Sequence, residues 1–384
     1  MIRSFAALAT ALLLAPTAHA FDTSAEAAFV IDQTTGTVLL DKNADVAQPP
    51  ASMSKLMKLY MAFEAVRDGR LTLDEELPVS AHAQSYGGSS MFLRQGERVS
   101  VEDLIRGIIV LSGNDACVVI AEAVSPTGNE AGVARRMTQR AQQLGMTNST
   151  FSNANGWPQA GHRMSMRDLA LLSNLLITDF PQFYPLFAET EFEFDGRVPA
   201  NRFNRNPLLT LGIGADGLKT GHTQEAGYGL TGSAVQGARR VIFVISGLET
   251  AAQRAQEAEA IVNWAFRQFA ERTLAPSGTV LAEADVWMGA EPKVGLIPAE
   301  DITALVPVLA SDMQAEVVFR GPIQAPIIRG AELAELVITS PEIGVQRFPL
   351  VADSDVAHGG FMARVTTAAK RLFEQLGEGT APAS

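Results

Sequence analysis

Pro49-Pro50-Ala51-Ser52-Met53-Ser54-Lys55-Leu56-Met57-Lys58 is the stretch around which we expect the chain to fold. Two prolines cannot lie inside a helix, but they can precede one. Apolar residues then recur at the three-to-four spacing of a buried helical face, at Leu56, Leu59, Phe63 and Val66. The pattern predicts a helix that begins near Ser52 and ends near Gly69, a residue type that suits the position after a helix.

The same helix carries a candidate nucleophile and a candidate base. Ser52 and Lys55 are three residues apart, so their side chains share one face, with roughly 5–6 Å between Cβ atoms. The amine can take the proton of the hydroxyl only when it is neutral, which requires its pKa to fall by roughly 3 units, or about 4–5 kcal/mol. Burial and a second cation lower such a pKa. The alternative is a helix-capping serine followed by a solvated lysine.

Length and composition limit the possible functions. The 384 residues are 47% hydrophobic and 19% charged, which is typical of a folded protein with two or three domains. The net charge of −12 and the lack of a basic stripe argue against a nucleic-acid partner. The five histidines have no metal-ligand spacing, so we expect no metal and no other cofactor.

The first 20 residues have the pattern of a signal peptide. Arg3 gives a basic start, residues 5–14 form an apolar run too short to span a bilayer, and Ala18-His19-Ala20 is a cleavage site. The expected mature chain begins at Phe21 and is exported, the alternative being an uncleaved membrane anchor. The single cysteine, Cys117, lies in an apolar run and is expected to be a small core residue.

Two further polar segments interrupt apolar surroundings. Ser112-Gly113-Asn114 separates two apolar helical patterns, at 101–110 and 116–124, so its polar groups must be satisfied or functional. Lys219-Thr220-Gly221 lies in an expected strand, where a glycine often marks the close approach of a ligand or another backbone. Taken separately, these segments also fit a plain helix-to-helix turn and an edge strand with a solvated lysine.

The rest of the pattern predicts antiparallel strands, more helices and a separate all-β region. Strands are expected at 28–32, 37–40, 216–223, 228–234 and 241–245. Further helices are expected at 137–144, at 169–177 after a Ser165 cap, and from 251 to about 270. Later expected strands, at 286–288, 317–319, 327–328 and 336–339, are separated by proline, glycine and charged turns. The tail, 356–384, has an amphipathic helical stripe suited to a membrane interface.

In this order and in an exported chain, the three polar segments resemble those of the low-molecular-mass penicillin-binding proteins, the serine-type D-alanyl-D-alanine carboxypeptidases. The resemblance extends over nearly the whole mature chain. It implies an α+β fold, in which a penicillin-binding, β-lactamase-like domain combines an antiparallel sheet flanked by helices with an all-helical part. We expect a signal peptide at 1–20, this catalytic domain at 21–271, an all-β domain at 272–355, and an amphipathic helix and tail at 356–384.

The chemistry of the three segments suggests how they cooperate. Lys219 is the second cation that could lower the pKa of Lys55, which then acts as general base for Ser52. We expect Lys219 to stay charged, because it lies on a strand edge. The resemblance further implies that Ser112 relays the proton to the leaving amine and that Asn114 orients Lys55 and the substrate amide.

The resemblance also implies a substrate-binding set. Lys219 and Thr220 would grip the terminal carboxylate, while the backbone N–H groups of Ser52 and His222 would form the oxyanion hole beside Gly221. Arg254 lies where the family has a substrate-carboxylate arginine, the alternative being an arginine on a helix surface.

The implied substrate is a peptidoglycan peptide, and β-lactams are implied as covalent inhibitors. The implied location is the periplasm, with peripheral contact to the outer face of the inner membrane. A class A β-lactamase is a rival, but it needs a glutamate for deacylation, and the loop from Gly145 to Arg167 contains no acidic residue. A second rival, a non-catalytic wall-binding scaffold, is disfavoured because all the required side chains are present.

Overall fold

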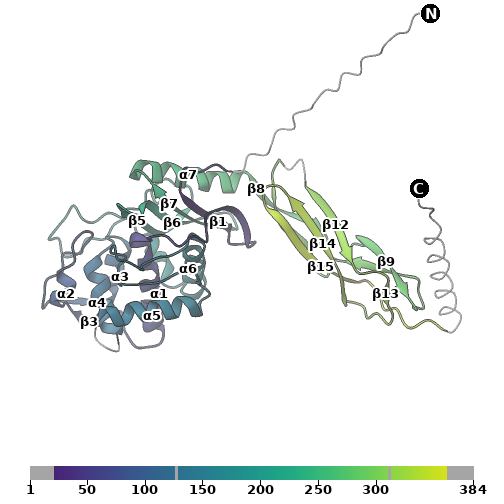
Figure 1. Ribbon diagram of the computed structural model, residues 1–384, viewed down its shortest axis with the longest axis horizontal. Coiled ribbons are helices and arrows are strands. Elements are labelled where there is room, and N and C mark those ends of the chain that lie inside the picture. Colours follow the sequence, from purple (N-terminus) through teal and green to yellow (C-terminus); the bar gives the residue numbers. More distant parts are fainter. Residues whose placement is uncertain (1–20, 126–128, 310–312, 361–384) are drawn as a thin grey trace, which may run out of the picture.

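A five-stranded antiparallel sheet forms the centre of the N-terminal part of the chain (Figure 1). The computed structural model describes residues 21–125, 129–309 and 313–360. The strand order in the sheet is β2-β1-β7-β6-β5. Its strands are β1 (Ala27–Asp32), β2 (Thr37–Lys42), β5 (Ala215–Thr223), β6 (Gly227–Gln236) and β7 (Arg239–Leu248). The short strands β3 (Glu76–Pro78) and β4 (Arg98–Ser100) pair separately. The five strands predicted for this sheet are therefore confirmed.

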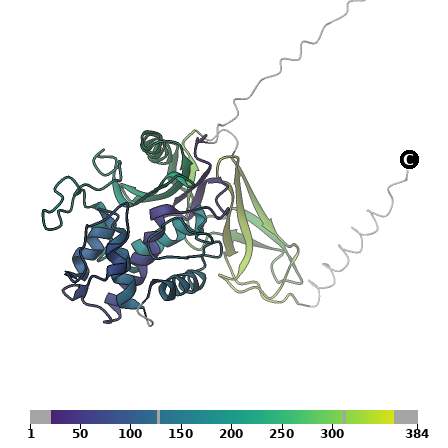
Figure 2. The same ribbon diagram turned by 60° about the vertical axis from the view of Figure 1, so that its left-hand side comes forward.

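Helices cover both faces of the sheet (Figures 1 and 2). The helices of this part of the chain are η1 (Ala51–Ser54), α1 (Lys55–Arg67), α2 (Ala81–Gln84), α3 (Val101–Ile109), α4 (Asn114–Val124), α5 (Glu130–Gln143), α6 (Met166–Asp179), η2 (Tyr184–Ala188) and α7 (Ala251–Arg267). Alternating residues of β7 serve the two faces: Phe243 joins the core beneath α7, whereas Ile242 and Val244 join the core on the side of α1 and α6. The edge strand β5 lies against η1, which brings two of the sequence motifs together.

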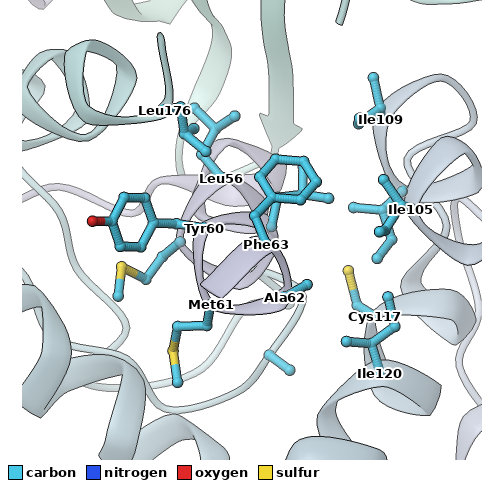
Figure 3. Packing of buried hydrophobic residues seen from close by; sticks show 14 of the residues in the cluster. Leu56, Tyr60, Met61, Ala62, Phe63, Ile105, Ile109, Cys117, Ile120 and Leu176 are labelled. Carbon is cyan, nitrogen blue, oxygen red and sulfur yellow. The ribbon is translucent and has the colours of Figure 1, made fainter. Parts of the chain in front are cut away.

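Helix α1 runs through the middle of the larger core (Figure 3). Leu56 and Phe63 lie among side chains of the neighbouring helices, including Ile105 of α3, Cys117 of α4 and Leu176 of α6. The sequence predicted one apolar face, but helices surround α1 and bury most of its circumference. Even the side chain of Lys58 has no exposed surface.

Most predicted helix boundaries agree with the structure, with three differences. Ser165 caps α6 as expected, its hydroxyl accepting a hydrogen bond from the backbone N–H of Asp168 at 3.1 Å. Helix α4 already begins at Asn114, and α5 begins before the predicted start at Met137. Helix α7 ends at Arg267 rather than near Ala270, because the chain turns there into strand β8.

Beyond α7 the chain forms an all-β part with its own core, as the sequence predicted. Its strands are β8 (Phe269–Ala275), β9 (Ala282–Trp287), β10 (Lys293–Ile297), β11 (Ile302–Pro307), β12 (Gln314–Phe319), β13 (Ile323–Gln324), β14 (Glu332–Ser340) and β15 (Gly344–Ala352). Strands β8, β10, β11, β13 and β15 were not predicted. The strand predicted at 327–328 is wrong, because Ile327 makes only an isolated bridge to Val356.

The signal peptide predicted at 1–20 and the tail helix, of which 361–384 is the main part, lie outside the described residues. Within the described part of the chain, no helix combines the length and the hydrophobicity needed to cross a membrane.

Candidate active site

The backbone around Ser52 is held between a loop and the edge of the sheet. Ala51 has a φ of 49°, in the left-handed region that is unfavourable for residues with a Cβ. A Cβ on Gly156 would lie 2.0 Å from the carbonyl oxygen of Ala51, and a Cβ on Gly221 would lie 3.0 Å from that of Pro50. Glycine at both positions therefore lets two segments approach η1 closely, and Gly221 brings β5 to the nucleophile.

Lys55 is the centre of a buried hydrogen-bond network. Its Nζ atom lies 2.7 Å from Ser52 Oγ, 2.8 Å from Asn114 Oδ1 and 2.5 Å from the backbone carbonyl oxygen of Asn155. The side chain has no exposed surface, and this burial lowers the pKa of its ammonium to about 8. At neutral pH a fraction of Lys55 is thus neutral and able to accept a proton from Ser52.

Asn114, at the start of α4, joins Lys55 to the glycine-containing loop that carries Gly87 and Ser89. Its Nδ2 donates to the carbonyl of Gly87 at 2.8 Å, and its backbone N–H donates to that of Ser89 at 2.8 Å. Ser112, two residues before Asn114, is 2% exposed. Its φ of 59° lies in the left-handed region, so its backbone is strained like that of Ala51. Among the residues that the structure describes, the Ser112 hydroxyl makes no hydrogen bond to Ser52 or to either motif lysine.

Lys219 does not face solvent, which corrects one expectation from the sequence. Strand β5 is an edge strand, but its side chains alternate between the two faces, so Lys219 and Gly221 both point toward η1. The lysine is only 2% exposed, and its Nζ donates to the carbonyl of Thr220 at 3.4 Å. Burial, followed by the positive charges of Lys55 and Arg205, lowers the pKa of Lys219 well below its usual value.

Burial, rather than Lys219, is therefore the main reason why the pKa of Lys55 is low. The expected arrangement, in which a Lys219 that stays charged lowers the pKa of Lys55, is wrong in that respect. Both amines are buried and both lose basicity because each is taken out of water, and the charge of Lys55 further lowers the pKa of Lys219.

His222 and Arg254 meet on the face of the sheet that α7 covers. The His222 ring stacks on its cross-strand neighbour Tyr228 with ring centroids 3.8 Å apart, and the Arg254 guanidinium lies 5.7 Å from the centre of the same tyrosine ring. Arg254 is only 9% exposed, so the alternative of an arginine on a helix surface is wrong. In the described part of the chain its Nε has no hydrogen-bond partner.

Sequence reasoning missed two residues of this region. Asn155 contributes its backbone carbonyl to Lys55, and a main-chain carbonyl leaves no residue-specific signal in a sequence. Arg205 donates a hydrogen bond to Ser89 Oγ, accepts a hydrogen bond from Arg254 through its own carbonyl, and adds positive charge near both motif lysines. The described residues contain no group of histidine, cysteine or acidic side chains placed to hold a metal ion.

Comparisons with known proteins agree with this geometry. A family profile described as D-alanyl-D-alanine carboxypeptidase matches residues 14–250, and one described as the penicillin-binding protein 5 C-terminal domain matches residues 269–358. The D-alanyl-D-alanine carboxypeptidase DacC of Escherichia coli is 34% identical, covering 98% of this chain and 97% of that protein.

Two solved structures extend the likeness to the fold. The crystal structure of the carboxypeptidase DacD from Francisella tularensis matches with a TM-score of 0.76 and 27% identity, covering 88% of this chain and 95% of that one. Penicillin-binding protein D2 from Listeria monocytogenes, in its ampicillin-bound form, matches with a TM-score of 0.58 and 32% identity, covering 64% of this chain and 98% of that one. The family and the α+β fold predicted from the motifs are confirmed: the chain belongs to the serine-type D-alanyl-D-alanine carboxypeptidase family.

Proposed function

We propose that the protein removes the terminal D-alanine from peptidoglycan pentapeptides through an acyl-enzyme on Ser52. The observation that carries this proposal is the 2.7 Å contact between Ser52 Oγ and the buried amine of Lys55. A hydroxyl becomes nucleophilic when an adjacent base takes its proton, and burial gives Lys55 a pKa of about 8, close enough to neutrality for that task.

In the acylation step Ser52 Oγ attacks the carbonyl carbon of the amide between the two D-alanines, and its proton moves to Lys55. Asn114 and the carbonyl of Asn155 hold the amine in position and stabilise it once it is charged. The backbone N–H groups of Ser52 and His222 are the proposed donors to the oxyanion. When the amide C–N bond breaks, the proton on Lys55 moves through the Ser112 hydroxyl to the leaving amine, which leaves Lys55 neutral again.

The terminal carboxylate of the substrate is the proposed partner of the buried cations. Lys219 and Thr220 lie on β5, and Arg254 approaches from α7 with an unpartnered Nε in the described structure. Burial lowers the pKa of Lys219, so an entering carboxylate would favour its charged form. Lys219 thus keeps the carboxylate-binding role expected from the sequence, but its charge is supported by the substrate anion rather than by an exposed position on the strand edge.

Water then hydrolyses the ester on Ser52 and releases the shortened peptide. A β-lactam presents an amide carbonyl to the same nucleophile and is expected to leave a long-lived acyl group there. We infer export to the periplasm from the leader-like pattern at 1–20, and peripheral contact with the inner membrane from the amphipathic pattern at 356–384.

The test uses the purified mature chain, from Phe21 onward, with a D-Ala-D-Ala-terminated pentapeptide and a fluorescent penicillin. The wild type is expected to release D-alanine and to become labelled, whereas Ser52→Ala does neither. Ser54 is a poor alternative nucleophile, because it is fully buried and donates its hydroxyl to the carbonyl of Ala51 at 3.1 Å. Labelling that persists in Ser52→Ala would overturn the assignment of the nucleophile, and a wild type that releases no D-alanine would overturn the proposed activity.

A further inference from the structure

Glu130, the first residue of α5, is a buried carboxylate outside the three sequence motifs. It is 8% exposed and follows Asn129, whose side chain accepts a hydrogen bond from the N–H of Gly132 and so caps the helix. The start of a helix favours negative charge because its free N–H groups point outward. The Glu130 side chain therefore lies at an end of α5 where N–H groups are free.

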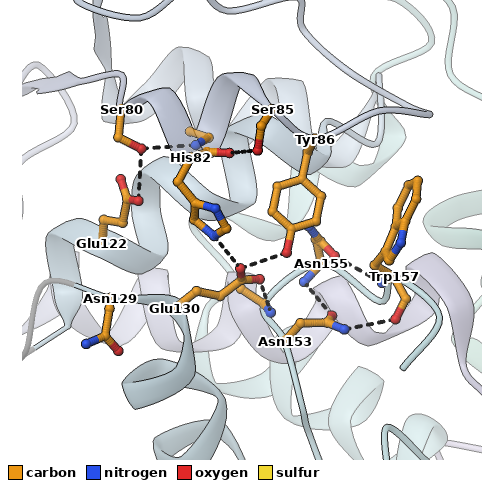
Figure 4. A network of polar contacts seen from close by, with 12 residues as sticks. Ser80, His82, Ser85, Tyr86, Glu122, Asn129, Glu130, Asn153, Asn155 and Trp157 are labelled. Atoms are coloured by element: carbon orange, nitrogen blue, oxygen red, sulfur yellow. Dashed lines mark hydrogen bonds and ion pairs between the residues drawn. The ribbon is translucent and has the colours of Figure 1, made fainter. Parts of the chain in front are cut away.

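Three donors converge on this carboxylate (Figure 4). Oε1 accepts from the backbone N–H of Ala154 at 2.9 Å, and Oε2 accepts from the Tyr86 hydroxyl at 2.7 Å and lies 2.9 Å from His82 Nε2. Burial and the contact with Glu130 raise the pKa of Tyr86, so the tyrosine keeps the proton that it donates. Because all three groups contact one side chain, the segments that carry them are held together.

Two of the three donors are each one residue away from a direct contact of the active site. Ala154 precedes Asn155, whose carbonyl accepts a hydrogen bond from Lys55. Tyr86 precedes Gly87, whose carbonyl accepts a hydrogen bond from Asn114, the other side-chain partner of Lys55. A single carboxylate thus connects the loop on one side of Lys55 with the loop on the other.

We propose that Glu130 is a positioning residue for the carboxypeptidase reaction: by holding the loops at Ala154 and Tyr86, it keeps Asn155 and Asn114 in place around Lys55. This inference rests on the proposed function. Glu130 makes no contact with the reacting atoms in this account. It acts through two peptide units, and a displacement of about 1 Å at such distances is enough to cost about 100-fold in rate.

A substitution at Glu130 must leave the other groups that act on Lys55 unchanged. The groups that act electrostatically on Lys55 are Arg205, Cys117 and Asp115. In the part of the chain that the structure describes, none of them forms a hydrogen bond with Glu130. Replacing the carboxylate with an amide of the same shape therefore leaves these groups in place, while one of its two acceptor oxygens becomes an NH2 donor, so Ala154 and Tyr86 no longer each have an oxygen to donate to.

The experiment compares Glu130→Gln and Tyr86→Phe, singly and combined, with a matched control, Glu122→Gln. Glu122 is a partly buried acid that accepts a hydrogen bond from Ser80 Oγ, the N-cap residue of α2, at 2.9 Å, and within the described structure it makes no hydrogen bond to Tyr86 or Ala154. The second-order rate constant of acylation by a fluorescent penicillin is measured for each full-length mature protein from pH 5.5 to 9.5. Thermal unfolding of the same samples shows whether each variant is folded.

Glu130→Gln is expected to acylate about 10- to 100-fold more slowly than the wild type at its optimum, and Tyr86→Phe less severely. The double variant should be no slower than Glu130→Gln alone, because both changes break the same contact. The acid limb of the pH profile should move to lower pH, since a displaced Asn155 carbonyl no longer stabilises the charged form of Lys55. A residue that only stabilised the fold would not move that limb. Glu122→Gln should match the wild type.

Two results would overturn the inference while leaving the proposed function intact. One is a folded Glu130→Gln whose acylation rate and acid limb equal those of the wild type. The other is a Glu130→Gln that acylates normally but accumulates the acyl-enzyme, which would make Glu130 a base for deacylation. A wild type that is not labelled at all contradicts the proposed function instead, so the two failures are distinguishable.

Discussion

The first and second turns of α1 each bury a lysine, and the two lysines differ in their hydrogen-bond partners. Lys55 and Lys58 both have no exposed surface, and both interact electrostatically with the thiol of Cys117. The amine of Lys55 has three hydrogen-bond partners, whereas that of Lys58 has none in the described part of the chain. Burial lowers the pKa of Lys58 to about 7, somewhat below the value of about 8 at Lys55.

This comparison separates what burial does from what partners do. Burial alone makes both amines weak bases, because the charged form loses its water. Only Lys55 has acceptors that hold it against a hydroxyl, so only Lys55 is placed to move a proton. An unpartnered buried amine is costly to the fold, and removing it is expected to help stability. The two lysines should therefore respond to the same substitution in opposite ways.

The largest expected effect is on acylation when Lys55 is replaced. Lys55→Met removes the proposed base but keeps much of the side-chain volume, so the second-order rate constant with a fluorescent penicillin should fall about 10³- to 10⁴-fold. Lys58→Met makes the same change one turn away and should leave the rate within about a factor of three of the wild type. Equal losses in the two variants would show that burial of the helix, rather than the contact with Ser52, controls reactivity.

A second expectation concerns pH. The base is active when neutral, so the acylation rate of the wild type should rise about tenfold per pH unit below the Lys55 pKa of about 8 and level off above it. Lys55 takes up its proton before Lys58 does as the pH falls, because its pKa is the higher of the two. Lys58→Met should therefore leave the midpoint in place. A midpoint that moves by a full unit in this variant would mean that the two amines titrate together.

The sequence predicted the motif residues around Lys55 but not the environment of Lys58. Spacing along one helix is enough to pair Ser52 with Lys55, since residues three apart share a face. The burial of Lys58 depends on α4 and α5 packing against the polar side of α1, and no pattern within residues 55–67 reports that. Amphipathic spacing predicted one buried face for a helix that is enclosed by its neighbours.

Other misses have related causes. Asn155 acts through its backbone, and Glu130 acts through contacts with residues 24 and 44 positions away, so neither has a local signature. The expectation for Lys219 failed because an edge strand was equated with an exposed side chain, whereas its inward face is covered by η1. In the all-β part, the predicted strands are short apolar runs. Strand β15 was not predicted, and most of its positions are exposed or only partly buried.

The smallest expected effect is on stability, and it concerns Lys58. Replacing an uncompensated buried charge with an apolar group of similar volume typically stabilises a protein by about 1–4 kcal/mol. Lys58→Met should therefore raise the midpoint of thermal unfolding at pH 7 by several degrees, at roughly 2–4 °C per kcal/mol for a domain of this size. Lys58→Gln serves as the control, because it removes the charge but leaves a polar group without a partner, and it should gain less.

The pH dependence of that gain provides the stricter test. The pKa of Lys58 falls from 10.5 to about 7 on folding, so between these values the unfolded chain binds a proton that the folded chain does not. The free energy of unfolding should therefore rise with pH across this window, and the cost of the buried amine should be fully present below pH 7 and absent above 10.5. Lys58→Met should flatten the rise, so its advantage over the wild type is greatest at pH 6–7 and disappears near pH 10. An advantage that stays constant with pH would mean that better packing, rather than the removal of a titrating amine, stabilises the variant, and the contrast between the two turns of α1 would then not be electrostatic.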